Sequence, residues 1–384
     1  MGLWIGLLFA AALFGALYVY WDRREDQKWH DHVPNQLIVR FHDGITEEQM
    51  IEIHRKAKCE LIGSDQELGI YHLSSKRKMR RIWKHYQGLD EIEFAEPNYR
   101  FKAFATSNDP YFASYQYGPQ TIQAPSAWDV TQGSAAVKIA VVDTGVQLDH
   151  PELQSKIIQG YDYVNNDANP MDGNGHGTHV AGIASAVTNN AYGIAGVCPL
   201  ASILPVRVLD DSGSGDLLNV ARGIVFAAAQ GAQVINLSLG SPATSSTLQS
   251  AIDYAWRSGA VIVAAAGNDG SVVPSYPANY PNVISVASTN ANDVKSGFSN
   301  YGRWVDVAAP GENILSTYPG SYYAYLSGTS MASPHVAGLA ALLASQGKTN
   351  VQIQSVIQTT SDPIPGTGTF WKFGRVNAAR AVRS

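Results

Sequence analysis

From about residue 134 onward, short apolar runs alternate with stretches of helical spacing. Such near-continuous apolar strands are buried on both faces, so the alternation predicts a doubly wound, mostly parallel α/β sheet with helices on both sides. In sheets of this kind the functional site lies beyond the carboxyl ends of the strands. The expected strands are 137–142, 202–209, 234–239, 261–266 and 283–288, and the expected helices are 179–187, 217–230, 247–257 and 331–345.

Residues 33–104 have a different pattern. Strand-like segments are expected at 36–41, 69–73, 92–94 and 99–101, and helices at 46–58 and 80–86. This approximates a β-α-β-β-α-β order, so a small α+β (ferredoxin-like) domain is predicted ahead of the α/β domain. A chain of 384 residues is long enough for two such cores.

Charge and cysteine content exclude some function classes. Residues 1–104 carry 15 basic and 15 acidic side chains, so the formal net charge of −5 belongs to residues 105–384. Because neither region is strongly basic, no nucleic-acid partner is expected. Cys59 and Cys198 are the only cysteines, and they fall in different predicted domains. Stability is therefore expected from packing or bound ions and not from disulfides.

The N-terminus is apolar from Leu3 to Trp21, nineteen residues without a charged side chain. That length fits an export signal or a membrane span, and the flanking charges do not choose between them. A buried core helix is a third interpretation. We expect residues 1–30 to be an export signal or membrane anchor, which places the protein outside the cell, with membrane contact only through residues 3–21.

Three polar segments interrupt the α/β pattern. A buried strand ends in Asp143, His176 opens an apolar helix, and Ser330 lies where a Gly-containing loop enters another helix. A serine nucleophile needs a base and a carboxylate that orients the base. It also needs oxyanion donors, which the Ser330 backbone N–H and the Asn268 side chain at a strand end could supply.

Each segment also has a structural interpretation. Asp143 and Asn268 could belong to turns, Ser330 could be an ordinary helix cap, and His179 could be the reactive histidine in place of His176. The combination is more informative than its parts. The order Asp, His, Ser at strand ends and helix starts distinguishes this arrangement from two other common triad architectures.

The segments Asp143-Thr144-Gly145, His176 to Gly182 and Gly328 to Ala332 resemble the three signature motifs of the subtilisin-like serine peptidases. The resemblance covers residues 108–384, and segments such as 108–112, 117–120 and 366–369 resemble a thermostable secreted member. It implies that Asp143 orients His176, that His176 is general base and acid, and that Ser330 is the nucleophile. Asn268 then completes the oxyanion hole, and His179 is structural.

The resemblance also implies how an extended polypeptide substrate is held between two edge segments as an added strand. A broad apolar pocket would take the residue before the cleaved bond, with Asp269 at its rim. The residues implied are Gly213, Ser214 and Gly215 for one edge, Ser238, Leu239 and Gly240 for the other, and Ala265, Ala266 and Gly267 for the pocket.

Structural calcium is implied as well, because family members bind it through oxygen ligands in loops. Glu152 stands where the thermostable relative has Asp, and Asn165 also replaces an Asp. The tight site would use Asp109, Glu152, Asn190 and the carbonyls of Val187, Tyr192 and Ile194; a weaker one would use Asp162, Asn165 and Asp167.

Residues 31–104 resemble the inhibitory pro-domain of the family, and residues 105–384 the catalytic domain. The chain is therefore expected to be its own intramolecular inhibitor and to cut itself between Phe104 and Ala105. The mature enzyme is expected to be a monomer. One rival is a serine-carboxyl peptidase, which lacks the histidine; another is an inactive binding protein, which would be expected to have lost a triad residue.

Overall fold

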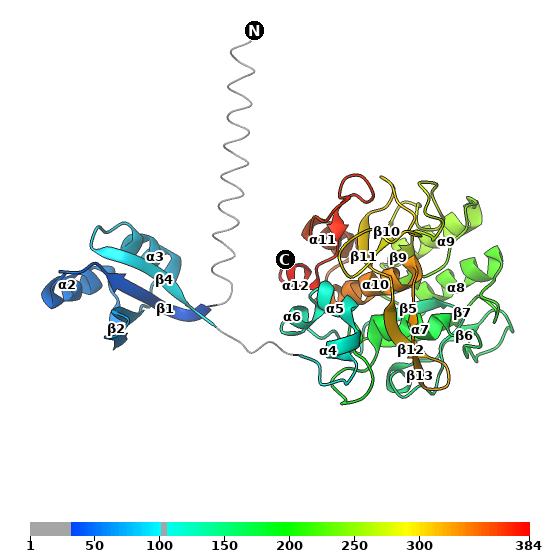
Figure 1. The fold of residues 1–384 in the computed structure, drawn as a ribbon, viewed down its shortest axis with the longest axis horizontal. Helices are drawn as coiled ribbons and strands as arrows, with labels where there is room; N and C mark the ends of the chain where they lie inside the picture. Colours follow the sequence, from blue (N-terminus) through cyan, green and yellow to red (C-terminus); the bar gives the residue numbers. More distant parts are fainter. Residues whose placement is uncertain (1–31, 101–105) are drawn as a thin grey trace, which may run out of the picture. The chain divides into compact units, whose positions relative to one another are not determined.

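The computed structural model describes residues 32–100 and 106–384, which form two compact units (Figure 1). Each unit is described by itself. The predicted export or anchor segment and the predicted cleavage site at Phe104 and Ala105 lie outside the described residues. Within the described ranges, no helix is long and apolar enough to cross a membrane.

The N-terminal unit has the order β-α-β-β-α-β that the sequence pattern approximated. Its four strands form one antiparallel sheet in the order β2-β3-β1-β4. Two details differ from the expectation. Strand β2 was not anticipated, and β4 runs unbroken through Pro97, which is tolerated because β4 is an edge strand. The elements are β1 (His32–Phe41), α2 (Glu47–Ala57), β2 (Glu60–Asp65), β3 (Ile70–Ser74), α3 (Met79–Gln87) and β4 (Ile92–Tyr99).

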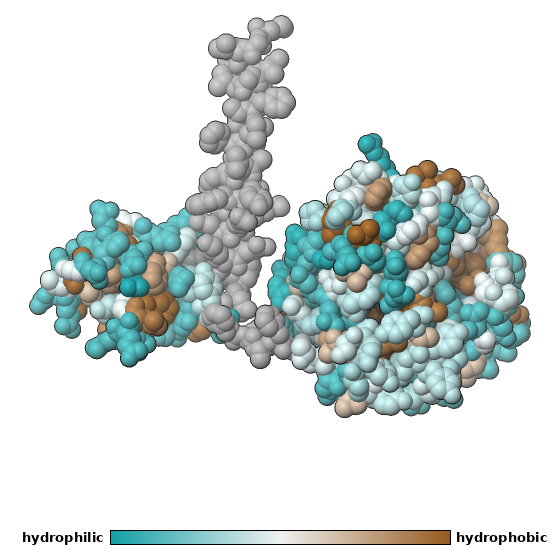
Figure 2. Space-filling model, viewed as in Figure 1, coloured by the Kyte–Doolittle hydropathy of each residue, from teal (hydrophilic) through white to brown (hydrophobic). Residues whose placement is uncertain are grey.

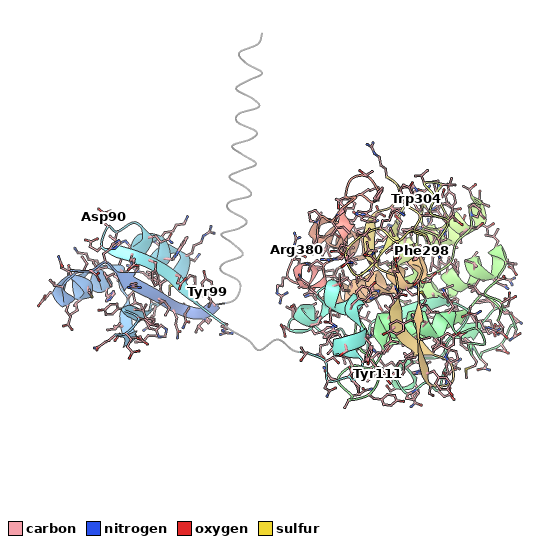
Figure 3. The ribbon with its side chains drawn as sticks, viewed as in Figure 1. Asp90, Tyr99, Tyr111, Phe298, Trp304 and Arg380 are labelled. Carbon is pink, nitrogen blue, oxygen red and sulfur yellow. The ribbon has the colours of Figure 1, made fainter. Side chains whose placement is uncertain are left out.

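Local sequence explains both helices of this unit. Thr46 caps α2 in a reciprocal capping box with Gln49. Helix α3 buries Ile82, Trp83 and Tyr86 against the sheet, and Gly88 is its C-cap, two residues before Asp90 (Figure 3). The visible surface of each unit is mostly hydrophilic with small hydrophobic patches (Figure 2).

The C-terminal unit is built on an eight-stranded sheet whose strand pairs are all parallel. Its order is β14-β11-β10-β9-β8-β5-β7-β6. A separate antiparallel hairpin, β12–β13, leads into a helix of 17 residues, α10 (Thr329–Ser345). The strands are β5 (Lys138–Asp143), β6 (Tyr161–Asp162), β7 (Ser202–Arg207), β8 (Val234–Leu237), β9 (Val261–Ala265), β10 (Val283–Thr289), β11 (Val307–Pro310), β12 (Ile314–Tyr318), β13 (Tyr322–Leu326) and β14 (Gly374–Arg375).

Helices cover both faces of this sheet, which confirms the predicted class. In β9, Val261 and Val263 pack in the cluster of α10, whereas Ile262 and Ala264 pack in the cluster of α8 and α9. The helices are α4 (Phe112–Tyr115), α5 (Tyr117–Thr121), α6 (Ala124–Trp128), α7 (His176–Ser185), α8 (Leu217–Ala229), α9 (Ser246–Arg257), α10 (Thr329–Ser345), α11 (Asn350–Thr360) and α12 (Ala378–Ala381), with a 3₁₀ turn at Gln154–Lys156.

The strand order reverses direction at β5. The chain passes from β5 to β7 on one side and continues through β8, β9 and β10 on the other. The carboxyl end of β5 is therefore a topological switch point, where α/β sheets commonly form their binding crevice. Asp143 is the last residue of that strand.

Candidate active site

Asp143 and His176 form a close pair at this switch point. Asp143 ends β5 and is fully buried, and His176 is the first residue of α7. The Asp143 Oδ1 atom lies 2.7 Å from His176 Nδ1 and also accepts the Thr144 backbone N–H at 2.7 Å. The carboxylate therefore holds the imidazole so that Nε2 is the nitrogen left for chemistry.

The two histidines of this segment differ in environment. Burial lowers the pKa of His176, but the charge and hydrogen bond of Asp143 outweigh burial and raise it above the usual value. Burial lowers the pKa of His179 to about 3, and its Nε2 lies 3.0 Å from the carbonyls of Ile314 and Ala324. His179 thus ties α7 to the β12–β13 hairpin, which suits a structural residue.

Ser330 lies in the first turn of α10, after the N-cap Gly328. Its hydroxyl donates to the Ser238 carbonyl at 3.1 Å, and its own carbonyl accepts the Ser238 hydroxyl at 2.8 Å. Within the described residues, the Ser330 hydroxyl bonds Ser238 and not His176; catalytic hydrogen bonds often form only when substrate is bound. The nucleophile loop is thereby fixed to the end of β8.

The Asn268 side chain is oriented by the same loop. Its Oδ1 accepts the backbone N–H of Thr329 at 2.8 Å and the Thr329 hydroxyl at 2.9 Å. Among the residues that the structure describes, Asn268 Nδ2 has no hydrogen-bond partner, so it is the end of the amide left to donate. Asn268 and Ser330 line the same cavity.

Two adjoining cavities form a cleft beside these residues. One, of about 740 Å³, is lined by His176 together with Gly213, Ser214, Gly215, Ser238, Leu239 and Gly240. The other, of about 600 Å³, is lined by Ser238–Gly240, Ala265, Gly267, Asn268, Asp269 and Ser330. Ala266 differs from the expectation: it is buried in a core cluster, because alternate residues of a strand end point to opposite sides.

The residues expected to form the tight cation site lie together. Asp109 and Glu152 are 3% and 0% exposed, and among residues 32–100 and 106–384 no ion pair neutralises either. Burial raises the pKa of Glu152 to about 7 despite hydrogen bonds from Ile194 N, Tyr323 and Asn190. The loop carbonyls of Val187, Tyr192 and Ile194 are neighbours of these groups in sequence. Asn190 joins the two acids, because its backbone N–H donates to Asp109 at 3.0 Å and its side-chain amide donates to Glu152 at 3.2 Å. Two buried carboxylates close together without a cationic partner fit a hard cation.

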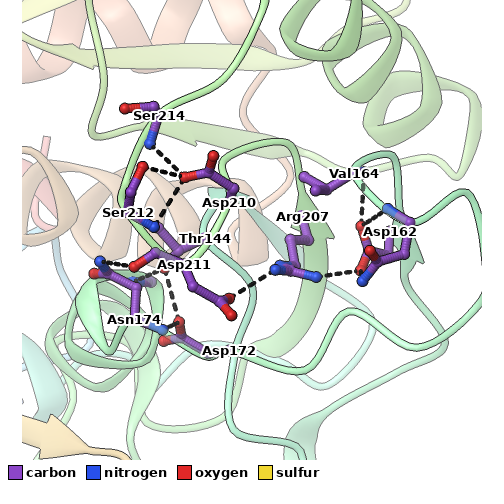
Figure 4. A network of polar contacts seen from close by, with 12 residues as sticks. Thr144, Asp162, Val164, Asp172, Asn174, Arg207, Asp210, Asp211, Ser212 and Ser214 are labelled. Atoms are coloured by element: carbon purple, nitrogen blue, oxygen red, sulfur yellow. Dashed lines mark hydrogen bonds and ion pairs between the residues drawn. The ribbon is translucent and has the colours of Figure 1, made fainter.

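The residues expected to form the weaker site do not fit a cation in the same way. The Arg207 guanidinium occupies the space between Asp162 (2.6 Å) and Asp211 (2.7 Å), as Figure 4 shows. The other Asp162 oxygen accepts the N–H groups of Val164 and Asn165. Asp167 accepts from Asn169 N. Arginine thus supplies the positive charge here, and we derive no role for an ion at this position.

Sequence reasoning missed a buried carboxylate next to the pair. Asp172 is 6% exposed and accepts hydrogen bonds from Thr144, Asn174, Gly175 and Thr178. One signal was available: α7 begins after Gly175, a residue without a capping side chain, so an outside acceptor was to be expected nearby.

Comparisons with known proteins agree with this geometry. Residues 134–376 match the subtilase family, and residues 22–98 match the fervidolysin N-terminal prodomain. The chain belongs to the subtilase family. This subtilase is therefore a serine endopeptidase with a prodomain.

Individual relatives support the same assignment. The subtilase is 50% identical to the thermophilic serine proteinase of Bacillus sp. (strain AK1) over 91% of this chain and 88% of that protein. It is 63% identical to thermitase of Thermoactinomyces vulgaris over 72% of this chain and 99% of thermitase, so the expected likeness to a thermostable member is confirmed. A solved protease of Pseudoalteromonas arctica PAMC 21717 has a TM-score of 0.68 and 37% identity, covering 73% of this chain and 99% of that one.

Proposed function

We propose that this subtilase is a secreted or cell-surface endopeptidase of broad specificity that works through an acyl-enzyme on Ser330. The observation that carries the proposal is the 2.7 Å contact between His176 and buried Asp143 at the mouth of a cleft that Ser330 and Asn268 line. The three groups needed for serine nucleophilic catalysis and an oxyanion donor are all available there.

The reaction follows from the roles of these groups. His176 Nε2 takes the Ser330 proton while Oγ attacks the scissile carbonyl carbon. The Ser330 backbone N–H and Asn268 Nδ2 stabilise the oxyanion that forms. His176 then gives the proton to the departing amine as the C–N bond breaks. Water repeats the sequence on the ester, returning Ser330 and releasing the acid.

Broad specificity is proposed from the lining of the cleft. Gly213–Gly215 and Ser238–Gly240 offer backbone groups on two sides, so an extended polypeptide would pair mainly through its own backbone. Ala265 and Gly267 leave a wide space for the preceding side chain. Asp269 is exposed at the rim and would favour basic side chains there.

We also propose a zymogen. In this proposal residues 1–30 direct export or anchor the chain, residues 31–104 inhibit, and residues 105–384 catalyse as a monomer after cleavage between Phe104 and Ala105. The match of residues 22–98 to a prodomain supports the inhibitory role.

Calcium is the proposed cofactor. Asp109, Glu152 and Asn190, with the carbonyls of Val187, Tyr192 and Ile194, would hold it. When bound, it would supply the positive charge that two buried carboxylates lack. Its role would be structural, since this site is separate from the residues that line the cleft.

The test compares the full chain with its Ser330→Ala variant. Wild type should react covalently with a fluorophosphonate at Ser330, hydrolyse casein and yield a new N-terminus at Ala105 in the medium fraction. Ser330→Ala should do none of these. A wild-type chain that stays unlabelled and inactive would refute the proposed activity. A variant that matures equally well when expressed alone would refute self-cleavage only.

A further inference from the structure

We propose that Asp172 is a positioning residue for the reaction. It holds the segment that carries Asp143 against the segment that carries His176, and it places a second negative charge near the imidazole. This inference rests on the proposed function of the triad.

The first observation is how the N-terminus of α7 is satisfied. Its first backbone N–H groups have no acceptor within the helix, and the N-cap Gly175 has no side chain to offer. Three side chains from outside the helix supply acceptors instead. His176 N donates to Asn174 Oδ1 (3.2 Å), Gly177 N to Thr144 Oγ1 (2.9 Å) and Thr178 N to Asp172 Oδ2 (2.9 Å).

The second observation is that Asp172 connects β5 to α7. Its Oδ1 accepts the Thr144 hydroxyl at 2.9 Å, and Thr144 directly follows Asp143. Its Oδ2 accepts the Thr178 hydroxyl at 2.6 Å, two residues after His176. With the N–H groups of Asn174, Gly175 and Thr178, the carboxylate accepts five hydrogen bonds (Figure 4 shows those to Thr144 and Asn174).

The third observation is that the start of α7 and the turn after Asp143 pack closely against each other. A Cβ atom on Gly177 would lie 2.0 Å from the Gly145 carbonyl oxygen, so the start of α7 approaches the turn after Asp143 as closely as a glycine allows. The 2.7 Å contact between Asp143 and His176 depends on that approach. Loss of the Asp172 connections would let the two segments separate, and small misplacements in a catalytic site are costly.

Charge gives Asp172 a second effect. The titratable groups that act on His176 are Asp143 on β5, Asp172 in the preceding loop and His179 on α7. A cation at the N-terminus of a helix is disfavoured by the helix dipole, and imidazolium forms at that end of α7 during the reaction. Asp172 offsets this and contributes, after Asp143, to the raised pKa of His176.

The experiment measures kcat, KM and the acid limb of the kcat/KM profile on a peptide substrate. Asp172→Asn keeps the shape but loses the charge and part of the acceptor capacity. We expect kcat to fall about 10-fold to 10²-fold, with KM little changed and the acid midpoint moved to lower pH. Thr144→Val should lower kcat without moving the midpoint, because the charge stays, and Thr144→Ser should restore most of kcat. Asp253→Asn on α9 should match wild type, because among the described residues this carboxylate accepts a side-chain hydrogen bond from Gln249 alone.

Several outcomes would overturn the inference. The inference is wrong if Asp172→Asn has the wild-type kcat and the wild-type acid midpoint of kcat/KM. This holds whatever the melting temperature of the variant, because a carboxylate with a structural role alone would lower only the stability. If Asp172→Asn does not accumulate as folded enzyme, Thr144→Val decides, and wild-type kcat in that variant contradicts the positioning role. Failure of the proposed function is a separate result, seen as wild-type enzyme that no fluorophosphonate labels.

Discussion

At the scale of single residues, Asn268 allows a direct measurement of transition-state stabilisation. Its Oδ1 is held by Thr329, so the Nδ2 group is oriented before substrate arrives. Asn268→Ala should lower kcat about 10²-fold to 10³-fold with little change in KM, the magnitude known for the relative subtilisin and not obtained from this chain. Asn268→Asp presents an acceptor in place of the donor and should be at least as impaired. An Asn268→Ala enzyme whose KM rises while kcat is unchanged would show that the amide binds substrate only.

The same residues show what sequence can predict at this scale. Asp143, His176 and Ser330 were found because their segments resemble a family and because they follow buried strands or open helices. The choice between His176 and His179 needed the resemblance, since three residues of sequence separation do not say which ring meets Asp143. For Asp172 the only signal was indirect: α7 begins after Gly175, which offers no capping side chain, and this does not say which residue supplies the acceptor. Its role exists only where β5 and α7 come together, and a single sequence does not show that contact.

At the scale of elements, a buried polar contact joins β8 to α10. Asn236 is fully buried in an otherwise apolar strand, donates to the Ser238 hydroxyl at 2.9 Å and accepts from Ser333 at 2.7 Å. Ser333→Ala should lower the free energy of unfolding by about 1–3 kcal/mol, because the Asn236 oxygen is left buried and unpaired. In the Ser330→Ala background, a denaturant cycle with Asn236→Ala should show a coupling of at least about 0.5 kcal/mol. The control is Thr359→Ala, because the Thr359 hydroxyl donates to carbonyls of its own helix, α11. Additive effects of the pair would contradict the linkage.

Strands buried on both faces could be predicted from the sequence, whereas very short or exposed strands could not. The strands β5, β7, β8, β9 and β10 are mostly apolar and were predicted to within a few residues, because burial on both faces leaves a strong pattern. Strand β14 has only two residues and β11 only four, and both rest on parallel pairing with a neighbour that is distant in sequence. Strand β2 is exposed along its length, so its sequence lacks the alternation that marks a half-buried strand.

At the scale of the whole molecule, calcium should set how stability depends on pH. Burial raises the pKa of Glu152 to about 7, so without an ion the folded chain binds a proton there more tightly than the unfolded chain does. That stabilisation is complete below the unfolded value of about 4.5 and is lost as pH rises through 7, about 3 kcal/mol in total. Bound calcium would take the place of the proton on Glu152 and keep the folded chain stable at higher pH. In the Ser330→Ala chain, EDTA should therefore lower the melting temperature little at pH 5 and by about 6 °C or more at pH 8.

Glu152→Gln should remove both the calcium effect and its pH dependence, whereas Asp167→Asn should leave them intact. Glu152 does not hold the ion if EDTA lowers the melting temperature equally at pH 5 and pH 8, and equally in chains with and without Glu152→Gln.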